Sequence, residues 1–508
     1  MGLYWAIIGE FKKIKAERGR KLMKMVSKNI FLEGQTCLTR GWYLRSSDIQ
    51  IPLTQADQFR IDTGVEIGEM ARSLYPQGTL VNERNNISNY EKTKQLISDD
   101  VKAIFEATFI HKDNIARADI LERIYGQWHL IEVKSSSASE KVKDELIDDL
   151  TYTAIILSLC GIEPKKMSLL LVSKTYLLGM NNRDFFIEVD CTEEVNKRRL
   201  NFIGKIDEIA HATGAPDMPE PKFIYPCKDC NYYKEYCLGK NIDDPIFDLP
   251  RLGEKKFKLY TEENISLVSQ IQMEDGLSTL QKMVWTTVRD KKPFINKEKL
   301  KELLEKIIFP AYYLDFESVS TAIPLYNNIG PYEEIVTQYS IHKFSAMNSN
   351  AEHFEFLADY SKDDRKALAE KILTDIGKEG SVIVYHAQAE KRFINNLAKA
   401  APDLANELHN IIDRIVDLEV ILRETYYHSE FHGSYSIKVV LPVLVPEMSY
   451  TNLVIGDGQS ANVVFAELAR SKYSAPEAAV LCKELLKYCG QDTLAMIKIH
   501  NALTVLSN

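Results

Sequence analysis

The feature that most constrains this chain is the distribution of four of its eight cysteines. Three lie close together as Cys227-(x2)-Cys230-(x6)-Cys237, and Cys37 lies 190 residues before the first of them. Outside a secreted disulfide framework, clustered cysteines more often bind metal than pair with one another. We therefore expect a metal centre here that joins the two ends of a domain. Thiolates suit both zinc and iron–sulfur clusters, and the spacing leaves both open.

Composition limits the classes of protein that this chain can belong to. Its 508 residues are 45% hydrophobic and 27% charged, which is enough for two or three domains with full cores. The net charge is −9, so contact with nucleic acid would depend on local patches or on metal ions rather than on a general basic coat. No stretch approaches bilayer length, and the first residues lack the order of a secretory signal, so we expect a cytoplasmic protein.

Hydrophobic periodicity and the proline and glycine residues that interrupt it divide the chain into four segments. We expect an N-terminal extension over residues 1–24, an α/β domain over 25–245, a helical connector over 246–306 and a second α/β domain over 307–508. Within the first domain the patterns predict helices over residues 64–78 and 92–109, followed by an antiparallel hairpin of strands 116–124 and 128–136. A further helix over 144–161 and a buried strand over 166–178 follow.

The predicted hairpin carries a set of residues suited to metal-dependent hydrolysis. Residues two apart on a strand face the same side, so Glu132 and Lys134 share a cleft that Asp119 joins from the paired strand. Two carboxylates can hold Mg²⁺ or Mn²⁺, and the lysine can orient a water molecule or stabilise developing charge. Glu66 and Glu69, three apart on the predicted helix, offer a further ligand from one face. The bare pattern is common on surface hairpins, but here the charges end an otherwise buried strand.

The residues RADIL and LIEVKSSS, followed by DDLTYTAIILSLCG, resemble the PD-(D/E)XK nucleases of the RecB type. The four-cysteine arrangement is similar to that of their iron–sulfur members, which include CRISPR-associated RecB-like exonucleases. This resemblance spans about residues 25–240 and implies a restriction-endonuclease-like fold with Asp119, Glu132 and Lys134 as catalytic set. It also implies a 4Fe–4S cluster held by four cysteines, namely Cys37, Cys227, Cys230 and Cys237. The family's glutamine after the lysine and its first-motif histidine are absent, so Glu66 or Glu69 would replace the histidine.

A second group of acids lies in the last 200 residues. Asp315 and Glu317 share one face of an apolar strand, where two carboxylates are costly unless they pair or bind a cation. Glu390 follows the strand SVIVYHA, and Tyr488 and Asp492 lie four apart on a helix. These four acids can hold two metal ions for in-line phosphoryl displacement, with Tyr488 orienting the attacking water.

The D-x-E and Y-x3-D patterns resemble the tyrosine variant of the DEDD 3′–5′ exonucleases, which have an RNase H-like fold. The resemblance implies Asp315, Glu317, Glu390, Tyr488 and Asp492 as site residues. The family's middle asparagine and aspartate are here His386 and Glu390, and Asp417 is given a supporting role. Residues 250–505 further resemble an uncharacterised domain that is fused to RecB-like nucleases in bacteria.

The sequence thus predicts a two-domain nuclease that uses Mg²⁺ or Mn²⁺ and acts on DNA. Three alternatives stay open: a single active site beside a nucleic-acid-binding platform, a non-catalytic nucleic-acid adaptor, and RNA as the substrate. Zinc stays open in place of the iron–sulfur cluster. For His428 and His432, structural or surface roles are expected, and the four scattered cysteines are expected to be ordinary buried thiols. These cysteines are Cys160, Cys191, Cys482 and Cys489.

Overall fold

The computed structural model describes residues 24–46, 51–273, 276–346, 349–451 and 453–508. Over these residues the chain forms two mixed β-sheets with helices packed around them, which confirms the predicted α/β class. Apart from Lys24, the extension expected over residues 1–24 lies outside the described residues. Within the described ranges, no helix combines the length and the apolarity that a bilayer crossing requires.

In the described part of the first half, a curled sheet has six strands in the sequential order β1-β2-β3-β4-β5-β6. The pairs β1–β2 and β4–β5 are parallel, and the other neighbours are antiparallel. The strands are β1 (Gly78–Leu80), β2 (Ala103–His111), β3 (Asn114–Ile124), β4 (Gln127–Ser137), β5 (Pro164–Val172) and β6 (Phe186–Asp190). The predicted hairpin is confirmed as β3–β4, because Tyr125 and Gly126 both take the positive φ that suits a two-residue turn.

Helices cover this sheet and carry the far cysteine. They are α2 (Lys28–Thr36), α3 (Leu38–Arg45), α4 (Gln55–Arg72), α5 (Asn86–Ser98), α6 (Asp144–Leu159), α7 (Thr192–Phe202) and α8 (Ile206–Thr213). The apolar helix α6 packs against β3 and β5, whereas α4 packs against β4. Cys37 lies between α2 and α3 as the cap residue of both.

The single helix predicted over residues 92–109 is wrong in its second part. The helix α5 ends at Ser98, Asp100 takes a φ of +58°, and β2 begins at Ala103. The run AIFEATFIH is rich in β-branched and aromatic residues and is mostly buried, as in a central strand. Its apolar residues fit a helical period only because they are almost continuous, which is the ambiguity expected of short apolar runs.

The helical segment expected as a connector is built into the second half. It contains α10 (Glu254–Glu262), α11 (Thr279–Asp290) and α12 (Lys297–Leu304), whereas α9 (Tyr233–Tyr236) precedes it. Its short strand β7 (Phe294–Ile295) pairs with β13 (Tyr426–Tyr427). One buried apolar cluster runs from Ile246 in this segment to Leu503 near the C-terminus, so the segment shares a core with the second domain.

The sheet of the second half has five strands among the described residues, in the order β10-β9-β8-β11-β12. These strands are β8 (Ala311–Val319), β9 (Ile335–Phe344), β10 (Glu352–Leu357), β11 (Ser381–Val384) and β12 (Ile415–Asp417). The first three are antiparallel, and β11 continues the sheet in parallel with β8 and β12. The helices are α13 (Arg365–Asp375), α14 (Ala387–Ala400), α15 (Ala405–Asp413), α16 (Leu418–Thr425), α17 (Ile437–Leu444), α18 (Gly458–Ala469) and α19 (Ala475–Ser507).

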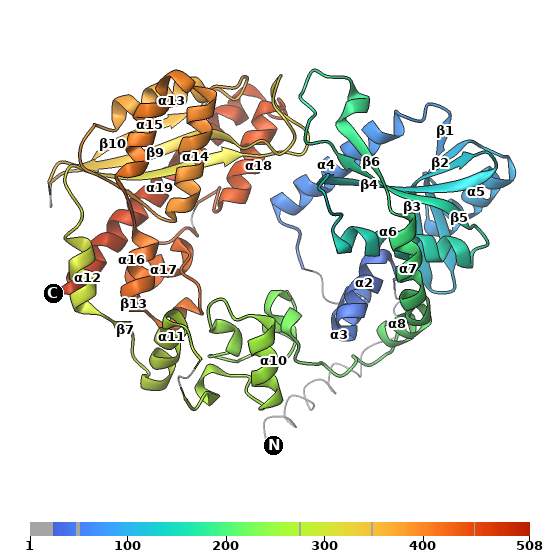
Figure 1. The fold of residues 1–508 in the computed structure, drawn as a ribbon, viewed down its shortest axis with the longest axis horizontal. Coiled ribbons are helices and arrows are strands. Elements are labelled where there is room, and N and C mark those ends of the chain that lie inside the picture. Colours follow the sequence, from blue (N-terminus) through green and yellow to red (C-terminus); the bar gives the residue numbers. More distant parts are fainter. Residues whose placement is uncertain (1–23, 47–50, 274–275, 347–348, 452) are drawn as a thin grey trace.

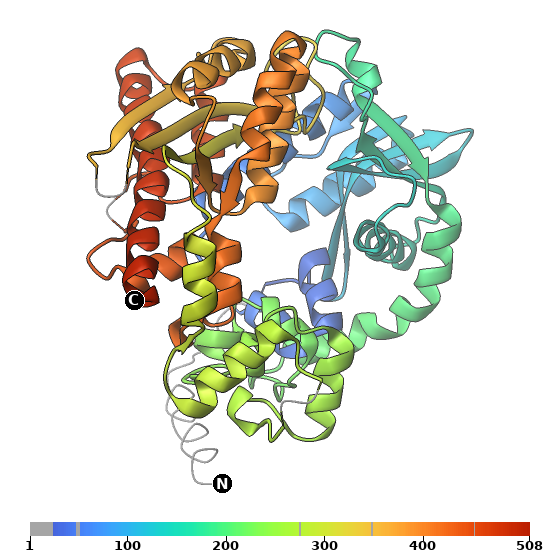
Figure 2. The same cartoon turned by 60° about the vertical axis from the view of Figure 1, so that its left-hand side comes forward.

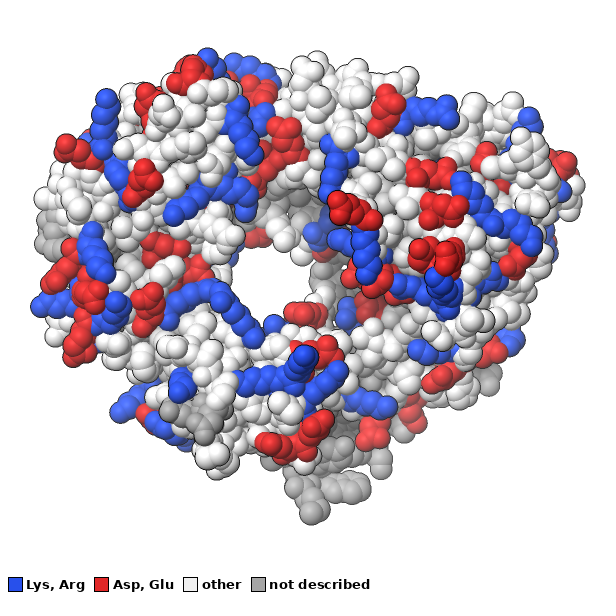
Figure 3. Space-filling view, in the orientation of Figure 1, with Lys and Arg blue, Asp and Glu red and all other residues white. Residues whose placement is uncertain are grey.

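The two halves and the helical segment are arranged as a ring (Figure 1). The first sheet and the second sheet lie on opposite sides, with α10 and α11 below them, and the turned view in Figure 2 agrees. In Figure 3 the side chains leave an opening in the middle, and both basic and acidic side chains lie near its rim. The halves touch directly, since Arg470 Nη1 lies 2.9 Å from Glu66 Oε2 and the Tyr332 hydroxyl donates to Ser135 O at 2.6 Å.

Candidate metal centres

The structure brings Asp119, Glu132 and Lys134 together at the β3–β4 hairpin. Ile120 pairs with Ile131, so Asp119 and Glu132 occupy the next opposing positions of the two strands. The Asp119 carboxylate accepts a hydrogen bond of 2.8 Å from the backbone N–H of Val133. Lys134 Nζ lies 3.1 Å from Glu132 Oε1. The register of the hairpin is therefore sufficient to bring Asp119, Glu132 and Lys134 together as predicted.

Two further residues enter this first centre from helices. Lys28, the first residue of α2, donates to Glu132 Oε1, and Asp149 of α6 accepts from Lys134 Nζ. The sequence did not indicate either residue as part of the site. Lys28 lies more than 100 residues before Glu132, and Asp149 lies on the helix that follows Lys134, so neither has a fixed spacing to the strand residues. The nearest signal was the pair of acids in DELIDDLTY, at the point where the RecB-like pattern has a glutamine.

The two carboxyl groups of the first centre hold their protons very differently. Burial, with a further contribution from Glu132, raises the pKa of Asp119 to about 8. Burial also acts to raise the pKa of Glu132, but Lys28 and Lys134 outweigh it and lower this pKa to about 2. Glu132 is therefore ionised and compensated by ammonium groups, whereas Asp119 stays protonated at neutral pH in the metal-free state. Among the described residues, the second oxygen of Glu132 has no hydrogen-bond partner although it is buried.

The structure does not gather Glu66 and Glu69 with these residues. Both are exposed on α4, where Glu66 pairs with Arg470 and Glu69 lies 3.7 Å from Arg72. Glu106 comes closer, because it interrupts the β2–β3 register opposite Asp119 with a φ of +55°. Burial raises its pKa, and Arg72 and Arg117 act against that rise. A distorted strand residue beside a cluster of acids is a common mark of a functional site.

The four cysteines of the predicted cluster converge from both ends of the first domain. Cys227 lies in the 3₁₀ turn η4 (Tyr225–Asp229), Cys230 ends that turn, and Cys237 ends α9. All are free thiols. Burial, then Cys227, Cys37 and Cys230, raise the pKa of Cys237 to about 11, so the four sulfur atoms lie within electrostatic range of one another.

Aromatic rings enclose the cysteines on one side. The ring of Tyr43 in α3 stacks on Tyr232 with centroids 4.8 Å apart, and its hydroxyl donates to Tyr236 O at 2.6 Å. Trp42 donates from its indole nitrogen to Ala215 O at 2.9 Å. These contacts tie α3 to the cysteine-bearing loop. The arrangement has the expected form of a staple that joins the two ends of the domain.

The second centre is the more compact one. Ligand oxygens of Asp315, Glu317 and Asp492 all lie within 4.8 Å of one another, and among the described residues no other group of three or more acids, histidines or cysteines is as close. Asp315 and Glu317 point from the same side of β8, and Asp492 comes from α19. Glu390, on the first turn of α14, is 4% exposed and approaches from the third element. The predicted convergence of these acids is thus present.

Like charges dominate this second centre. Burial, then Asp492, raises the pKa of Glu317 to about 8, and burial raises that of Asp492 to about 6 against hydrogen bonds from tyrosines. Burial, then neighbouring carboxylates, also raises the pKa values of Asp315 and Glu390 well above their usual range. One oxygen of Glu390 is buried without a hydrogen-bond partner among the described residues. Such a donor set fits a divalent cation, which would supply the missing positive charge.

Two tyrosines and one lysine border the second centre. The hydroxyl of Tyr450 donates to Asp492 Oδ1 at 2.5 Å, and Tyr488 forms a hydrogen bond with the same carboxyl group. Lys438 Nζ lies 5.6 and 5.4 Å from the ring centroids of Tyr450 and Tyr488, and its charge lowers the pKa of Glu317 against burial. Tyr488 was expected here, whereas Tyr450 and Lys438 come from an irregular segment and from α17.

Three residues beside the second centre, namely His386, Asp417 and Cys489, form hydrogen bonds that hold its surroundings in place. The carboxylate of Asp417 accepts from the backbone N–H groups of His386, Ala387 and Glu419 at 2.8 to 3.1 Å, so it holds the start of α14. His386 takes a φ of +76° and pairs with Glu419. The buried thiol of Cys489 donates to Asp315 Oδ2 at 3.4 Å, a polar contact that its apolar setting in the sequence did not indicate.

Comparison with known proteins identifies similarity without an assigned activity. A family model described as a domain of unknown function (DUF2779) matches residues 312–436. Uncharacterized protein MG366 of Mycoplasma genitalium is 27% identical over 229 residues, and its homolog in Mycoplasma pneumoniae is 25% identical over 239. Uncharacterized protein UU173 of Ureaplasma parvum is 26% identical over 221 residues. These matches cover 41%, 42% and 39% of this chain, and they span about a third of the length of each relative.

The charge state of the second centre leads to a prediction about stability. Carboxyl groups with raised pKa values hold protons in the folded chain that the unfolded chain releases near pH 4, so their favourable contribution is lost as pH rises towards 8. In chelator, the melting temperature should therefore fall between pH 5 and pH 8. Glu317→Gln should flatten this fall and raise stability at pH 8 by on the order of 1 kcal/mol, or about 2–4 °C. Scanning calorimetry across this range, with the exposed Glu379→Gln as control, checks it. An unchanged pH profile in Glu317→Gln would contradict it.

Proposed function

We propose that the protein is a metal-dependent nuclease with two phosphodiester-hydrolysing centres. The first is the RecB-like PD-(D/E)XK centre of Asp119, Glu132 and Lys134. The second is a DEDD-type 3′–5′ exonuclease centre, made by Asp315, Glu317, Glu390 and Asp492 with Tyr488 beside them. DNA is the expected substrate, and RNA is the alternative, because the DEDD type of centre serves both.

The observation that carries this proposal is the geometry of the second centre. Three carboxyl groups from β8 and α19 have ligand oxygens within 4.8 Å of one another, and the buried Glu390 adds an oxygen without a protein partner. A chain gains no stability from crowding like charges in this way, because desolvation and repulsion both oppose it. Such an arrangement is favoured where a divalent cation is bound for catalysis. The mixed sheet, with three antiparallel strands followed by parallel ones, is compatible with an RNase H-like fold.

The protein groups of the second centre have separate tasks. Asp315, Glu317, Glu390 and Asp492 would hold Mg²⁺ or Mn²⁺, which when bound supplies Lewis-acid activation of a phosphate and of water. Tyr450 and Tyr488 hold the Asp492 carboxylate in position through their hydroxyl groups. Lys438, beside both rings, supplies positive charge at the edge of the centre, where a phosphate would approach.

The first centre fits a cation through Asp119 and Glu132, since one buried oxygen of Glu132 lacks a protein partner. Lys134 is held between Glu132 and Asp149, which together raise its pKa against burial and keep its ammonium group charged. A charged lysine at this position would orient a water molecule and stabilise negative charge on the phosphate. Lys28 binds the other oxygen of the Glu132 carboxylate, Oε1, and its positive charge competes electrostatically with a cation at the free oxygen.

This competition favours a second candidate function, in which only the DEDD-type centre cuts. The first centre already balances Glu132 with two ammonium groups, whereas the second centre has four crowded acids beside Lys438. In that case the first domain would serve as a nucleic-acid-binding platform. A non-catalytic adaptor is the remaining alternative, and it would bind nucleic acid without any metal-dependent product.

We further propose that the four cysteines hold a 4Fe–4S cluster with a structural role. Support for this proposal comes from four free thiols that approach one another from both ends of the first domain, since soft thiolates are the ligands of such clusters. Zinc is the alternative.

Single-site variants test the two nuclease centres. Lys134→Ala should reduce cutting by the first centre at least about 100-fold, because it removes a group that stabilises transition-state charge. Asp315→Asn should reduce cutting by the second centre to a similar extent, because it removes a ligand of the cation that activates phosphate and water. The measurement is Mn²⁺-dependent degradation of 3′-labelled and 5′-labelled strands, which separates the two product ladders. The exposed Lys112→Ala serves as a matched control. Degradation at the wild-type rate by the double variant would refute the assignment.

The competition at Glu132 predicts the effect of removing Lys28. In an Asp315→Asn background, Lys28→Met should lower the Mn²⁺ concentration for half-maximal cutting by about fivefold, since a partly buried ion pair of about 1 kcal/mol no longer opposes the cation. Methionine keeps the apolar stem at the start of α2. Lys112→Met, which removes the exposed pair with Asp207, should leave this concentration unchanged. A higher Mn²⁺ requirement in Lys28→Met would show that Lys28 assists the reaction instead.

Iron content and colour test the cysteine cluster. Protein purified without oxygen should absorb broadly in the visible range and contain about four iron atoms per chain. Cys37→Ser should lose both, whereas Cys482→Ser, outside the cluster, should retain them. A colourless protein with one zinc per chain would replace the iron–sulfur proposal with the zinc alternative.

A further inference from the structure

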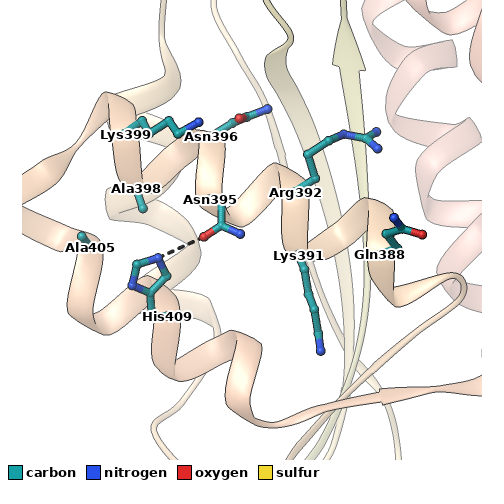
Figure 4. A pocket seen from close by; sticks show the side chains of 9 residues that line it. All are labelled: Gln388, Lys391, Arg392, Asn395, Asn396, Ala398, Lys399, Ala405 and His409. Atoms are coloured by element: carbon teal, nitrogen blue, oxygen red, sulfur yellow. Dashed lines mark hydrogen bonds between the residues drawn. The ribbon is translucent and has the colours of Figure 1, made fainter.

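A polar groove runs between α14 and α15 in the second half (Figure 4). Its volume is about 650 Å³. The residues that line it are Gln388, Lys391, Arg392, Asn395, Asn396, Ala398, Lys399, Ala405 and His409. Figure 4 shows these side chains along one side of α14, with His409 of α15 facing Asn395. The groove is therefore built mainly by one exposed helix face.

Positive charge in this groove is not balanced locally. Lys391 and Lys399 pair with no carboxylate among the described residues, and no aspartate or glutamate lines the groove. Arg392 differs, because it pairs with Glu334 at 2.8 Å. In a chain with a net charge of −9, two uncompensated ammonium groups in one concave surface favour a polyanionic ligand.

The remaining lining groups suit phosphates rather than bases. Gln388 and Asn395 are exposed amides that can donate hydrogen bonds, and His409 Nε2 lies 3.1 Å from Asn395 Oδ1. Lysine ammonium groups and side-chain amides are the usual partners of phosphate oxygens in nucleic-acid complexes. Apart from the His409 ring, the lining contains no aromatic side chain on which a base could stack.

The groove and the second centre lie on opposite faces of the same helix, α14. Glu390 lies on the buried face of this helix, whereas Gln388 and Lys391 lie on its exposed face within one turn. From Gln388 to Lys399 the helix rises about 17 Å, which leads away from the acids over a length of several nucleotides. A strand whose end occupies the second centre would reach this surface by passing round the N-terminal end of α14, where Gln388 and Glu390 lie within one turn.

We infer that the groove between α14 and α15 binds the sugar–phosphate backbone of the nucleic-acid strand that the second centre processes. This inference rests on the proposed nuclease function and adds the surface that holds the strand. Lys391 and Lys399 contact phosphates and the amides position the backbone, so binding here is independent of base sequence.

Salt dependence of binding tests this inference without requiring hydrolysis. The full-length protein is titrated into fluorescein-labelled single-stranded DNA or RNA oligomers in chelator, and anisotropy is measured from 0.05 to 0.5 M NaCl. The double variant Lys391→Gln with Lys399→Gln should reduce the slope of log affinity against log salt by about 1.4, since each phosphate contact on a single strand contributes about 0.7. By the same relation, its affinity at 0.1 M salt should be about 25-fold weaker.

The control removes the same charge elsewhere. Lys378→Gln with Lys483→Gln changes two exposed lysines outside the groove and should leave the slope within error of the wild type. If the slope of log affinity against log salt is unchanged in the Lys391 and Lys399 variant, the groove does not bind the backbone. This conclusion would hold even if Mn²⁺-dependent cutting by the wild type supports the nuclease function. If the wild type binds neither the DNA nor the RNA oligomer, the inference that the groove binds nucleic acid is refuted as well. Loss of Mn²⁺-dependent product with the binding slope intact would instead refute only the nuclease function.

Discussion

Buried negative charge is the constraint around which both halves of this chain are organised. A carboxylate that leaves water must gain a proton, an opposite charge or a cation, because desolvation otherwise costs several kcal/mol. In the first half Glu132 meets this requirement with Lys28 and Lys134 and stays ionised. In the second half the acids crowd one another, and the pKa values of Glu317 and Asp492 rise to about 8 and about 6. Two centres with similar ligands thus differ in how strongly each would attract a cation.

Helix α2 connects this electrostatic balance to the cysteines. It begins at Lys28 in the first centre and ends at Thr36, so Cys37 follows immediately at its far end. Nine helical residues span about 13 Å as a stiff rod, and a shift of Cys37 is therefore transmitted to Lys28. The cysteines therefore lie at one end of the helix that places the Lys28 ammonium group against Glu132. Under the proposed function, this connection would give them a positioning role at the first centre.

The parts of these sites that could be predicted from the sequence are those with local periodicity. Strand alternation predicted Glu132 with Lys134 and Asp315 with Glu317, and helical spacing predicted Tyr488 with Asp492. Residues that arrive through tertiary packing have no fixed spacing, and they were missed for that reason: Lys28, Asp149, Tyr450 and Lys438. The β2 strand was assigned to a helix because its almost continuous apolar run fits both periods. For Glu66 and Glu69, spacing identified the helix but could not tell which of its faces meets the first centre.

The position of Glu66 also bears on how the two halves are held. Its carboxylate pairs with Arg470, which in turn donates to Ile323 O, and Ala322 lies in a buried cluster with Ile67 and Tyr176. An ion pair exposed at its edge contributes little by itself, whereas the apolar cluster beneath it gives the contact its stability. At the other side of the ring, the helical segment shares a core with α16 and α19. The chain is thus closed by apolar packing on both sides of the opening, and this packing fixes the separation of the two acidic centres.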